Sequence, residues 1–179
     1  MNIFNTMTRT NIEIIKLIHK EEMHIRDIAD TLGISPGTVH KLVRMLAGEG
    51  VVLERKVKNR SVIILNRESP VLREMKRAMN FNDLINAHAY RKLRKLGRVG
   101  VYGSYAQGTD DPESDIDIWV KTDKKEIELR PLFRELEKEL GIKVNPLLLT
   151  GSRLDSLRKN DPEFCTRLKL TSMGDDLDR

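Results

Sequence analysis

Residues 99–120 read VGVYGSYAQGTDDPESDIDIWV, two short apolar runs joined by a turn that begins with glycine. The first run (Val99, Val101) predicts a buried strand, and the second predicts a strand that starts among two aspartates. Because alternate residues of a strand share a face, Asp115 and Asp117 are expected to point the same way. Adjacent carboxylates repel each other unless a cation lies between them, and Mg²⁺ prefers such oxygen ligands.

The turn between the two runs supplies a second feature. Gly103 allows the backbone to come close to a ligand, and Ser104 is expected at the start of a short helix, where free N–H groups favour phosphate. Gln107 and Gly108 complete the predicted nucleotide-binding set. The alternative is an Asp-x-Asp at a strand end beside an ordinary Gly-Ser turn. The two features at this spacing, each beside an apolar strand, favour a nucleoside triphosphate held next to a metal.

Gly103-Ser104 followed by Asp115-Ile116-Asp117 resembles the signature of the polymerase-beta-like nucleotidyltransferase superfamily, above all its minimal branch. The resemblance covers roughly residues 97–150. It implies an α+β fold, with a small mixed sheet flanked by helices. It also implies that an acceptor oxygen attacks the α-phosphorus of an NTP and releases pyrophosphate. Asp115 and Asp117 would be the catalytic residues and would hold Mg²⁺, with Mn²⁺ as an alternative.

Two positions depart from the pattern of the superfamily. Active members usually carry a third carboxylate on the following strand, and Asn145 stands at the matching place as the expected third metal ligand. An amide binds magnesium more weakly than a carboxylate and cannot act as a base. Gln107 stands where minimal members often have arginine. Asp110, Asp111, Glu113 and Asp155 are candidates for the missing acid, and Val144-Asn145-Pro146 is similar to a subgroup in which a winged helix precedes this domain.

The first part of the chain has the pattern of a different domain. Helices are expected from Thr8, over 25–32 and up to Ala47, followed by strands over 51–57 and 61–65. The segment from Ile25 to Leu46 reads IRDIADTLGISPGTVHKLVRML, with a glycine turn and a Ser-Pro helix start before the third helix. This region resembles the winged helix-turn-helix family over roughly residues 8–66.

That resemblance implies DNA binding by the third helix and the wing. Use of the domain for dimerisation or protein contact is the alternative, and homodimerisation is also expected because winged helices often read two half-sites. The predicted DNA-binding residues are polar or basic and outward-facing: Ser35, Thr38, His40, Lys41, Arg44, Lys56, Lys58 and Arg60.

The segments that follow are mostly helical. Residues 71–96 predict one or two helices, broken near residues 80–83 with Asn82 or Asp83 as a new cap, and they carry a basic cluster that either binds nucleic acid or solvates the surface. Three parts are therefore expected: a winged helix-turn-helix over 1–69, a basic helical linker over 70–96 and a nucleotidyltransferase-like domain over 97–179. Within the last part the expected elements are a helix over 126–140, a strand over 143–150, a broken helical stretch over 152–168 and a last strand over 168–173.

Composition narrows the functional classes. The 179 residues carry a net charge of +5, distributed as +3 over 1–69, +6 over 70–98 and −4 over 99–179. The basic first half of the chain indicates a polyanionic partner. The lone Cys165 excludes an internal disulfide framework and makes a zinc site improbable. No apolar run approaches the roughly 20 residues that span a membrane, and the single cysteine fits a reducing compartment, so a cytoplasmic protein is expected.

Two functional hypotheses follow. In the first, the chain is a metal-dependent enzyme that transfers a nucleotide from an NTP to an acceptor that the sequence does not name. In the second, it is a transcriptional regulator whose nucleotidyltransferase-like domain only binds nucleotide. A third and weaker hypothesis is the toxin-like or antitoxin-like role of some minimal nucleotidyltransferases.

Overall fold

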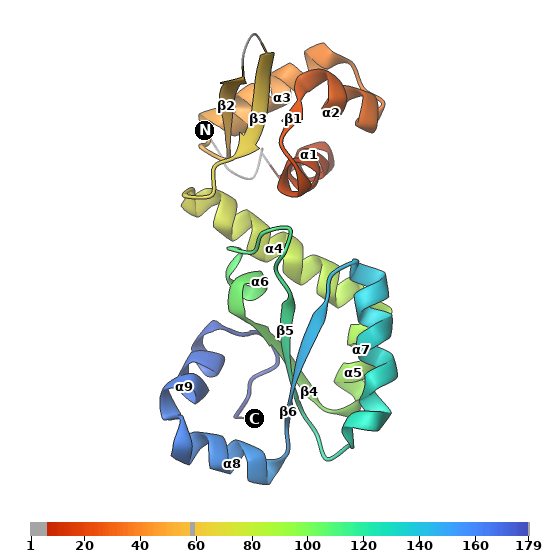
Figure 1. Cartoon of the computed structure of the whole chain (residues 1–179), viewed down its shortest axis with the longest axis vertical. Coiled ribbons are helices and arrows are strands. Elements are labelled where there is room, and N and C mark those ends of the chain that lie inside the picture. Colours follow the sequence, from red (N-terminus) through yellow and green to blue (C-terminus); the bar gives the residue numbers. More distant parts are fainter. Residues whose placement is uncertain (1–6, 58–59, 179) are drawn as a thin grey trace. The chain divides into compact units, whose positions relative to one another are not determined.

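A computed structural model describes residues 7–57 and 60–178 of the chain (Figure 1). Contacts between Cα atoms divide it into two compact units, Met1–Lys76 and Arg77–Arg179. The division expected from the sequence, at residues 69 and 96, stays a prediction.

The first unit is a small helical bundle with a three-stranded antiparallel sheet. Gly33 ends its second helix with φ of 65°, and the Ser35 hydroxyl accepts a hydrogen bond from the Thr38 N–H at the start of the next. Fully buried Ile14, Ile28 and Leu46 contribute to its core. The sheet order is β1-β3-β2. The elements are α1 (Arg9–Lys20), β1 (Met23–His24), α2 (Ile25–Leu32), α3 (Pro36–Gly48), β2 (Val52–Val57) and β3 (Arg60–Leu65).

The second unit is built on a four-stranded mixed sheet of order β6-β5-β4-β7. β5 pairs with β6 in parallel, whereas β4 pairs with β5 and with β7 in antiparallel fashion. The elements from the boundary onward are α4 (Pro70–Asn86), α5 (His88–Leu96), β4 (Arg98–Tyr102), α6 (Gly103–Gln107), β5 (Ile116–Lys121), α7 (Glu126–Leu140), β6 (Val144–Leu149), α8 (Gly151–Asn160), α9 (Pro162–Thr171) and β7 (Met173–Gly174). This is the expected mixed sheet flanked by helices.

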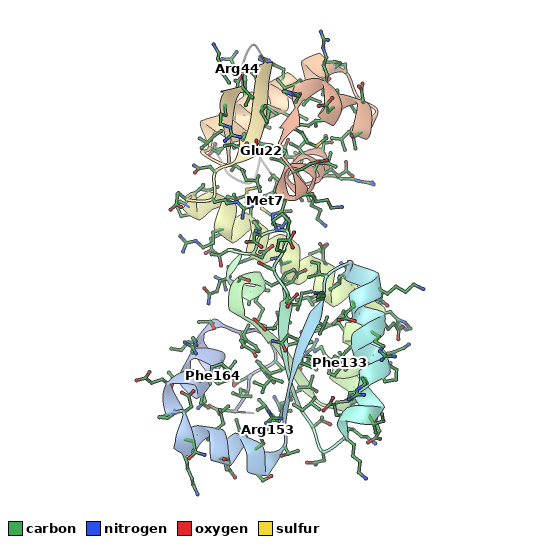
Figure 2. The ribbon with its side chains drawn as sticks, viewed as in Figure 1. Met7, Glu22, Arg44, Phe133, Arg153 and Phe164 are labelled. Carbon is green, nitrogen blue, oxygen red and sulfur yellow. The ribbon has the colours of Figure 1, made fainter. Side chains whose placement is uncertain are left out.

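Helices cover both faces of the sheet. Figure 1 shows α5 and α7 on one side and α8 and α9 on the other, and Figure 2 shows Phe133 and Phe164 on these opposite sides. Ile116 and Ile118 of β5 are fully buried with the α5 and α7 side chains. Trp119 lies in the second cluster, with side chains of α8 and α9.

Trp119 fixes the geometry of that second cluster. Its indole N–H donates to the Ser172 hydroxyl at 2.9 Å, and its ring is fully buried. A Cβ on Gly100, the cross-strand neighbour, would lie only 2.4 Å from the indole ring. Glycine at this position of β4 therefore leaves the space that the indole ring occupies.

The helix break expected near residues 80–83 is wrong. α4 runs without interruption to Asn86, and the second helix begins after Ala87, not after Asn82 or Asp83. The Asn80 side chain donates to the Tyr105 carbonyl at 2.9 Å and to Asp110 at 3.0 Å. Asn80 therefore stays within the helix and makes tertiary contacts with residues outside it.

The last strand is shorter than expected and starts later. α9 continues through Thr171, which leaves Met173–Gly174 to pair with β4. Leu168 is fully buried while Leu170 is 80% exposed, so these two residues do not share a strand face in the core. In the part of the chain that the structure describes, no helix combines the length and apolar character needed to cross a membrane.

Candidate functional site

The two predicted aspartates lie where β5 begins. Asp117 pairs with Tyr102 of β4 on one side and with Asn145 of β6 on the other. Because Ile116 and Ile118 enter the core on the α5 and α7 side, Asp117 projects from the opposite face. Asp117 is half-buried and Asp115 is exposed.

Gly103 is in close contact with this carboxylate. It adopts φ of 73°, a left-handed conformation that residues other than glycine rarely adopt. A Cβ at this position would lie 2.5 Å from Oδ2 of Asp117, well inside contact distance. The Gly-Ser turn therefore packs directly against the Asp-x-Asp motif, which is possible because residue 103 has no side chain.

Asn145 contacts the same carboxylate from the neighbouring strand. Its Nδ2 donates to Oδ1 of Asp117 at 2.9 Å. The bond orients Asp117 and occupies one of its oxygens, while the amide nitrogen rather than the amide oxygen faces the site. Ligation of a metal by Asn145 stays a prediction, since it requires the amide to turn.

The short helix α6 follows directly after this strand end. Ser104 is half-buried and Gln107 is exposed. The Ser104 carbonyl accepts N–H groups from Gly108 and, at 3.0 Å, from Thr109, with Gly108 left-handed at φ of 70°. Contact of these residues with phosphates stays a prediction.

Three of the four candidates for a third acid are engaged elsewhere, whereas Glu113 is exposed. Asp110 is 5% exposed and accepts from Asn80, and Asp111 accepts from the Ser114 hydroxyl at 2.9 Å within its own turn. Asp155 lies in α8 and pairs with Arg158 at 3.3 Å.

An aromatic contact links the carboxylate edge to α9. The Tyr102 ring meets Phe164 edge to face, with centroids 5.9 Å apart, and the Arg167 guanidinium lies 5.3 Å from the Phe164 centroid. Burial, and then the charge of Asp117, raise the pKa of Tyr102. Tyr102, Phe164 and Arg167 were not among the site residues expected from the sequence. The position of Tyr102 directly before Gly103 is the signal that could have indicated it.

Comparison with known proteins agrees with this geometry. A family model described as a nucleotidyltransferase domain matches residues 87–169. A protein of Methanocaldococcus jannaschii named "Putative protein adenylyltransferase" is 34% identical over 77 residues, which are 40% of this chain and 77% of the relative. The chain belongs to the nucleotidyltransferase family. Both resemblances inferred from the sequence are confirmed, because a winged helix-turn-helix DNA-binding model also matches residues 7–52.

The carboxylate pair of the nucleotidyltransferase domain suits a hard divalent cation. Asp115 is exposed and Asp117 is half-buried, and both carry the carboxylate oxygens that such a cation prefers. Nucleotidyltransferase domains generally use a divalent metal and an NTP. The choice of Mg²⁺ belongs to the proposal below.

A second group of metal-ligand types lies on the other side of the sheet. Ligand atoms of His88, Glu135 and Glu139 lie within 4.8 Å of one another. Glu135 accepts from Lys92 at 3.0 Å, and this hydrogen bond is the main cause that lowers the pKa of Glu135. Glu139 accepts the Ala89 N–H at 3.3 Å and thereby caps α5. Ion pairing and capping account for this cluster.

The winged-helix domain exposes the expected side chains of α3. Thr38, His40, Lys41 and Arg44 are exposed, as is Lys56 on β2. The Ser35 hydroxyl is used as the cap of α3. Lys58 and the side chain of Arg60 lie outside the described residues, and DNA contact by any of the residues in the predicted set stays a prediction.

Proposed function

We propose that the chain is a nucleotidyltransferase that transfers a nucleotidyl group from an NTP to a hydroxyl group of an acceptor. The geometry that carries the proposal is the junction of Gly103, Asp117 and Asn145, where the Gly-Ser turn lies against the Asp-x-Asp carboxylate. Asp115 and Asp117 would hold Mg²⁺, or Mn²⁺, which when bound neutralises phosphate charge. Ser104, Gln107 and Gly108 would contact the phosphates.

In this reaction the acceptor oxygen forms a bond to the α-phosphorus and the bond to pyrophosphate breaks. Asn145 has no basic group, so the proton of the acceptor hydroxyl passes to Asp115, to Asp117 or to solvent. Asn145 stands where a third acid is usual, and by donating to Oδ1 of Asp117 it would position that carboxylate. Positioning and electrostatics, without a covalent enzyme intermediate, supply the rate.

We further propose that the nucleotide is adenylate and the acceptor a protein side chain. The name of the M. jannaschii relative supports this choice, since the aligned region includes most of that protein. The winged-helix domain would bind DNA through Thr38, His40, Lys41, Arg44 and residues of the wing. A homodimer on two half-sites and a cytoplasmic location suit such a protein.

The test uses the full chain, Mg²⁺ and ATP labelled at the α-phosphate or, in parallel, at the γ-phosphate. Label from the α-position should appear on protein, whereas label from the γ-position should not. Asp115→Asn with Asp117→Asn should abolish the transfer, and the exposed Glu126→Gln serves as a control in the same domain. Transfer that persists in the double variant would disprove the assignment of the catalytic residues.

One observation favours a second candidate, a regulator that binds the nucleotide without transferring it. The place of the usual third carboxylate is taken by Asn145, whose amide donates to Asp117. Metal-dependent ATP binding without transfer, lost in the Asp115→Asn/Asp117→Asn variant, would support this candidate over the enzyme.

A further inference from the structure

A hollow of the nucleotidyltransferase domain lies at the opposite end of the sheet from the aspartates. Arg98 begins β4 and pairs with Lys121 at the end of β5, whereas Tyr102 and Asp117 form the pair at the other end. Four residue steps, about 13 Å at the rise of a strand, separate the two ends. The volume of the hollow, about 790 Å³, is in the range of small-molecule sites.

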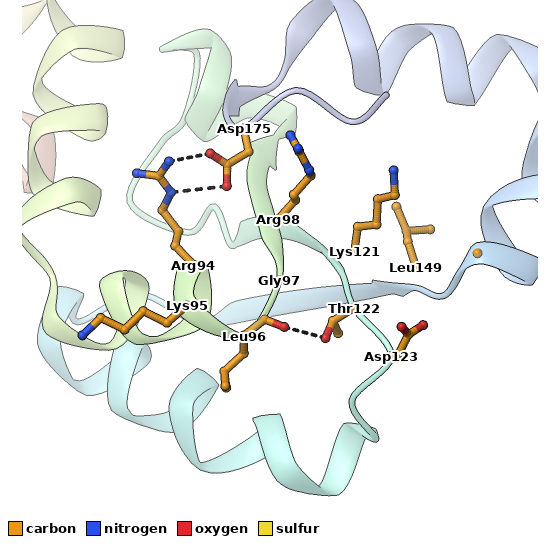
Figure 3. Close-up of a pocket in the computed structure, with 11 residues that line it drawn as sticks. Arg94, Lys95, Leu96, Gly97, Arg98, Lys121, Thr122, Asp123, Leu149 and Asp175 are labelled. Carbon is orange, nitrogen blue, oxygen red and sulfur yellow. Dashed lines mark hydrogen bonds and ion pairs between the residues drawn. The ribbon is translucent and has the colours of Figure 1, made fainter. Parts of the chain in front are cut away.

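This basic hollow carries a net positive charge. Its charged lining consists of the cations Arg94, Lys95, Arg98 and Lys121 and the carboxylates Asp123 and Asp175, which leaves a charge of +2. Arg94 is paired with Asp175 at 2.5 Å, as Figure 3 shows. Figure 3 also shows that Lys95 extends away from the other cations. Arg98 and Lys121 are therefore the cations that define the site.

Arg98 and Lys121 are directly opposite in the antiparallel pair, and their side chains rise in the same direction (Figure 3). Like charges in this arrangement destabilise a sheet. The two cations are held by main-chain oxygens: Arg98 donates to the Asp176 carbonyl at 3.5 Å, and Lys121 donates to the Leu177 carbonyl at 3.0 Å. Neutral carbonyls orient the cations without cancelling their charge.

Asp175, one of the two carboxylates of the lining, is already shared. Asp175 receives two hydrogen bonds from Arg94 and one from the Val99 N–H at 3.0 Å. Burial, the largest single effect, raises the pKa of Asp175. The hydrogen bond from Arg94 is the main cause that lowers it, the charge of Arg98 makes a minor contribution in the same direction, and the net shift is downward. One carboxylate thus faces two arginines, and Lys121 is bonded to a neutral carbonyl.

We propose that the basic hollow binds the phosphate group of a nucleotide-sized ligand through Arg98 and Lys121. A phosphate monoester carries a charge of roughly −1.5 to −2, which complements the two positive charges of Arg98 and Lys121 and relieves the repulsion between them. The volume exceeds what a lone phosphate fills, so the hollow has room for the remainder of the ligand. Because both contacts are cationic side chains, binding needs no divalent metal.

The test is a calorimetric titration of pyrophosphate into the full chain, with EDTA present, in the Asp115→Asn/Asp117→Asn background. In this form the test does not depend on catalysis, so its failure and the failure of the proposed function are distinguishable. Arg98→Gln with Lys121→Gln should weaken binding at least tenfold. Lys121→Arg should retain it, which separates loss of charge from loss of fold, and thermal melts check each variant.

The matched control removes two cations from the same domain, Lys124→Gln with Arg130→Gln, both exposed and paired with glutamates. It should leave the affinity within twofold. Absence of pyrophosphate binding, an unaffected Arg98→Gln/Lys121→Gln variant, or equal weakening in the control would overturn the proposal. Competition of AMP with pyrophosphate would support a nucleotide-sized ligand. Competition only by an oligonucleotide without terminal phosphates would overturn that ligand and indicate a nucleic-acid backbone instead.

Discussion

Gly103→Ala tests the link between the Gly-Ser turn and Asp117. The added methyl group would lie 2.5 Å from Oδ2, whereas ordinary van der Waals contact begins at 3.4 Å. The carboxylate must therefore move by about 1 Å. Displacements of this size in a catalytic group cost on the order of 100-fold in rate. We expect nucleotidyl transfer by the variant to fall by about that factor.

The same substitution also strains the backbone. A left-handed conformation costs a residue with a Cβ about 1–2 kcal/mol. For a unit of this size, each kcal/mol lowers Tm by about 4 °C. Gly141→Ala separates this strain from the displacement of Asp117, because Gly141 has φ of 69° in the same domain and its Cβ would meet nothing within 4 Å.

The assay measures transfer of α-labelled nucleotide, together with thermal melts of both variants. Both should lose similar stability, and only Gly103→Ala should lose activity. Activity of folded Gly103→Ala within threefold of the parent, or an equal loss in Gly141→Ala, would refute the reasoning about the carboxylate.

Three further predictions concern other sites. Asn145→Asp should tighten Mg²⁺ binding by about tenfold in a metal titration, because a third carboxylate replaces a neutral amide; unchanged affinity would exclude this position from the metal site. Asp175→Asn should cost about 1 kcal/mol at pH 7 in urea unfolding. Since the pKa of Asp175 is lowered in the folded state, its stabilisation is present above its ordinary value near pH 4 and lost as the pH falls, so the two proteins should converge in acid. Lys41→Ala and Arg44→Ala should each reduce the salt dependence of DNA binding by about one unit of the logarithmic slope, and unchanged slopes would remove α3 from the phosphate contacts.

Local signals in the sequence predicted most of the fold and much of the candidate site. A C-terminal glycine and a Ser-Pro start bound α2 and α3 as expected, because capping depends on neighbouring residues. The proximity of Gly103 and Asp117 follows from two strands meeting at one edge. The contact between Asn145 and Asp117 follows once β6 lies parallel to β5, because this pairing places the two residues side by side.

Features that depend on distant residues could not be read in this way. The start of α5 has no capping side chain of its own, since Glu139 of α7 accepts the Ala89 N–H. Asn80 looked like a helix breaker because its partners, Tyr105 and Asp110, lie 25 and 30 residues further along. Leu177 lies beyond the last expected strand, yet it is 2% exposed in the core beside Trp119. Its partners come from strands and helices that sequence periodicity does not bring together.

Trp119 is the one tryptophan of the 179 residues, and it belongs to the nucleotidyltransferase unit. It lies on β5, two residues after Asp117, and its fully buried indole donates to Ser172. Selective tryptophan fluorescence therefore reports the unfolding of this unit alone and contains no signal from the winged helix. Circular dichroism reports both units, so a comparison of the two melting curves would show, without labels or truncation, whether the units unfold together.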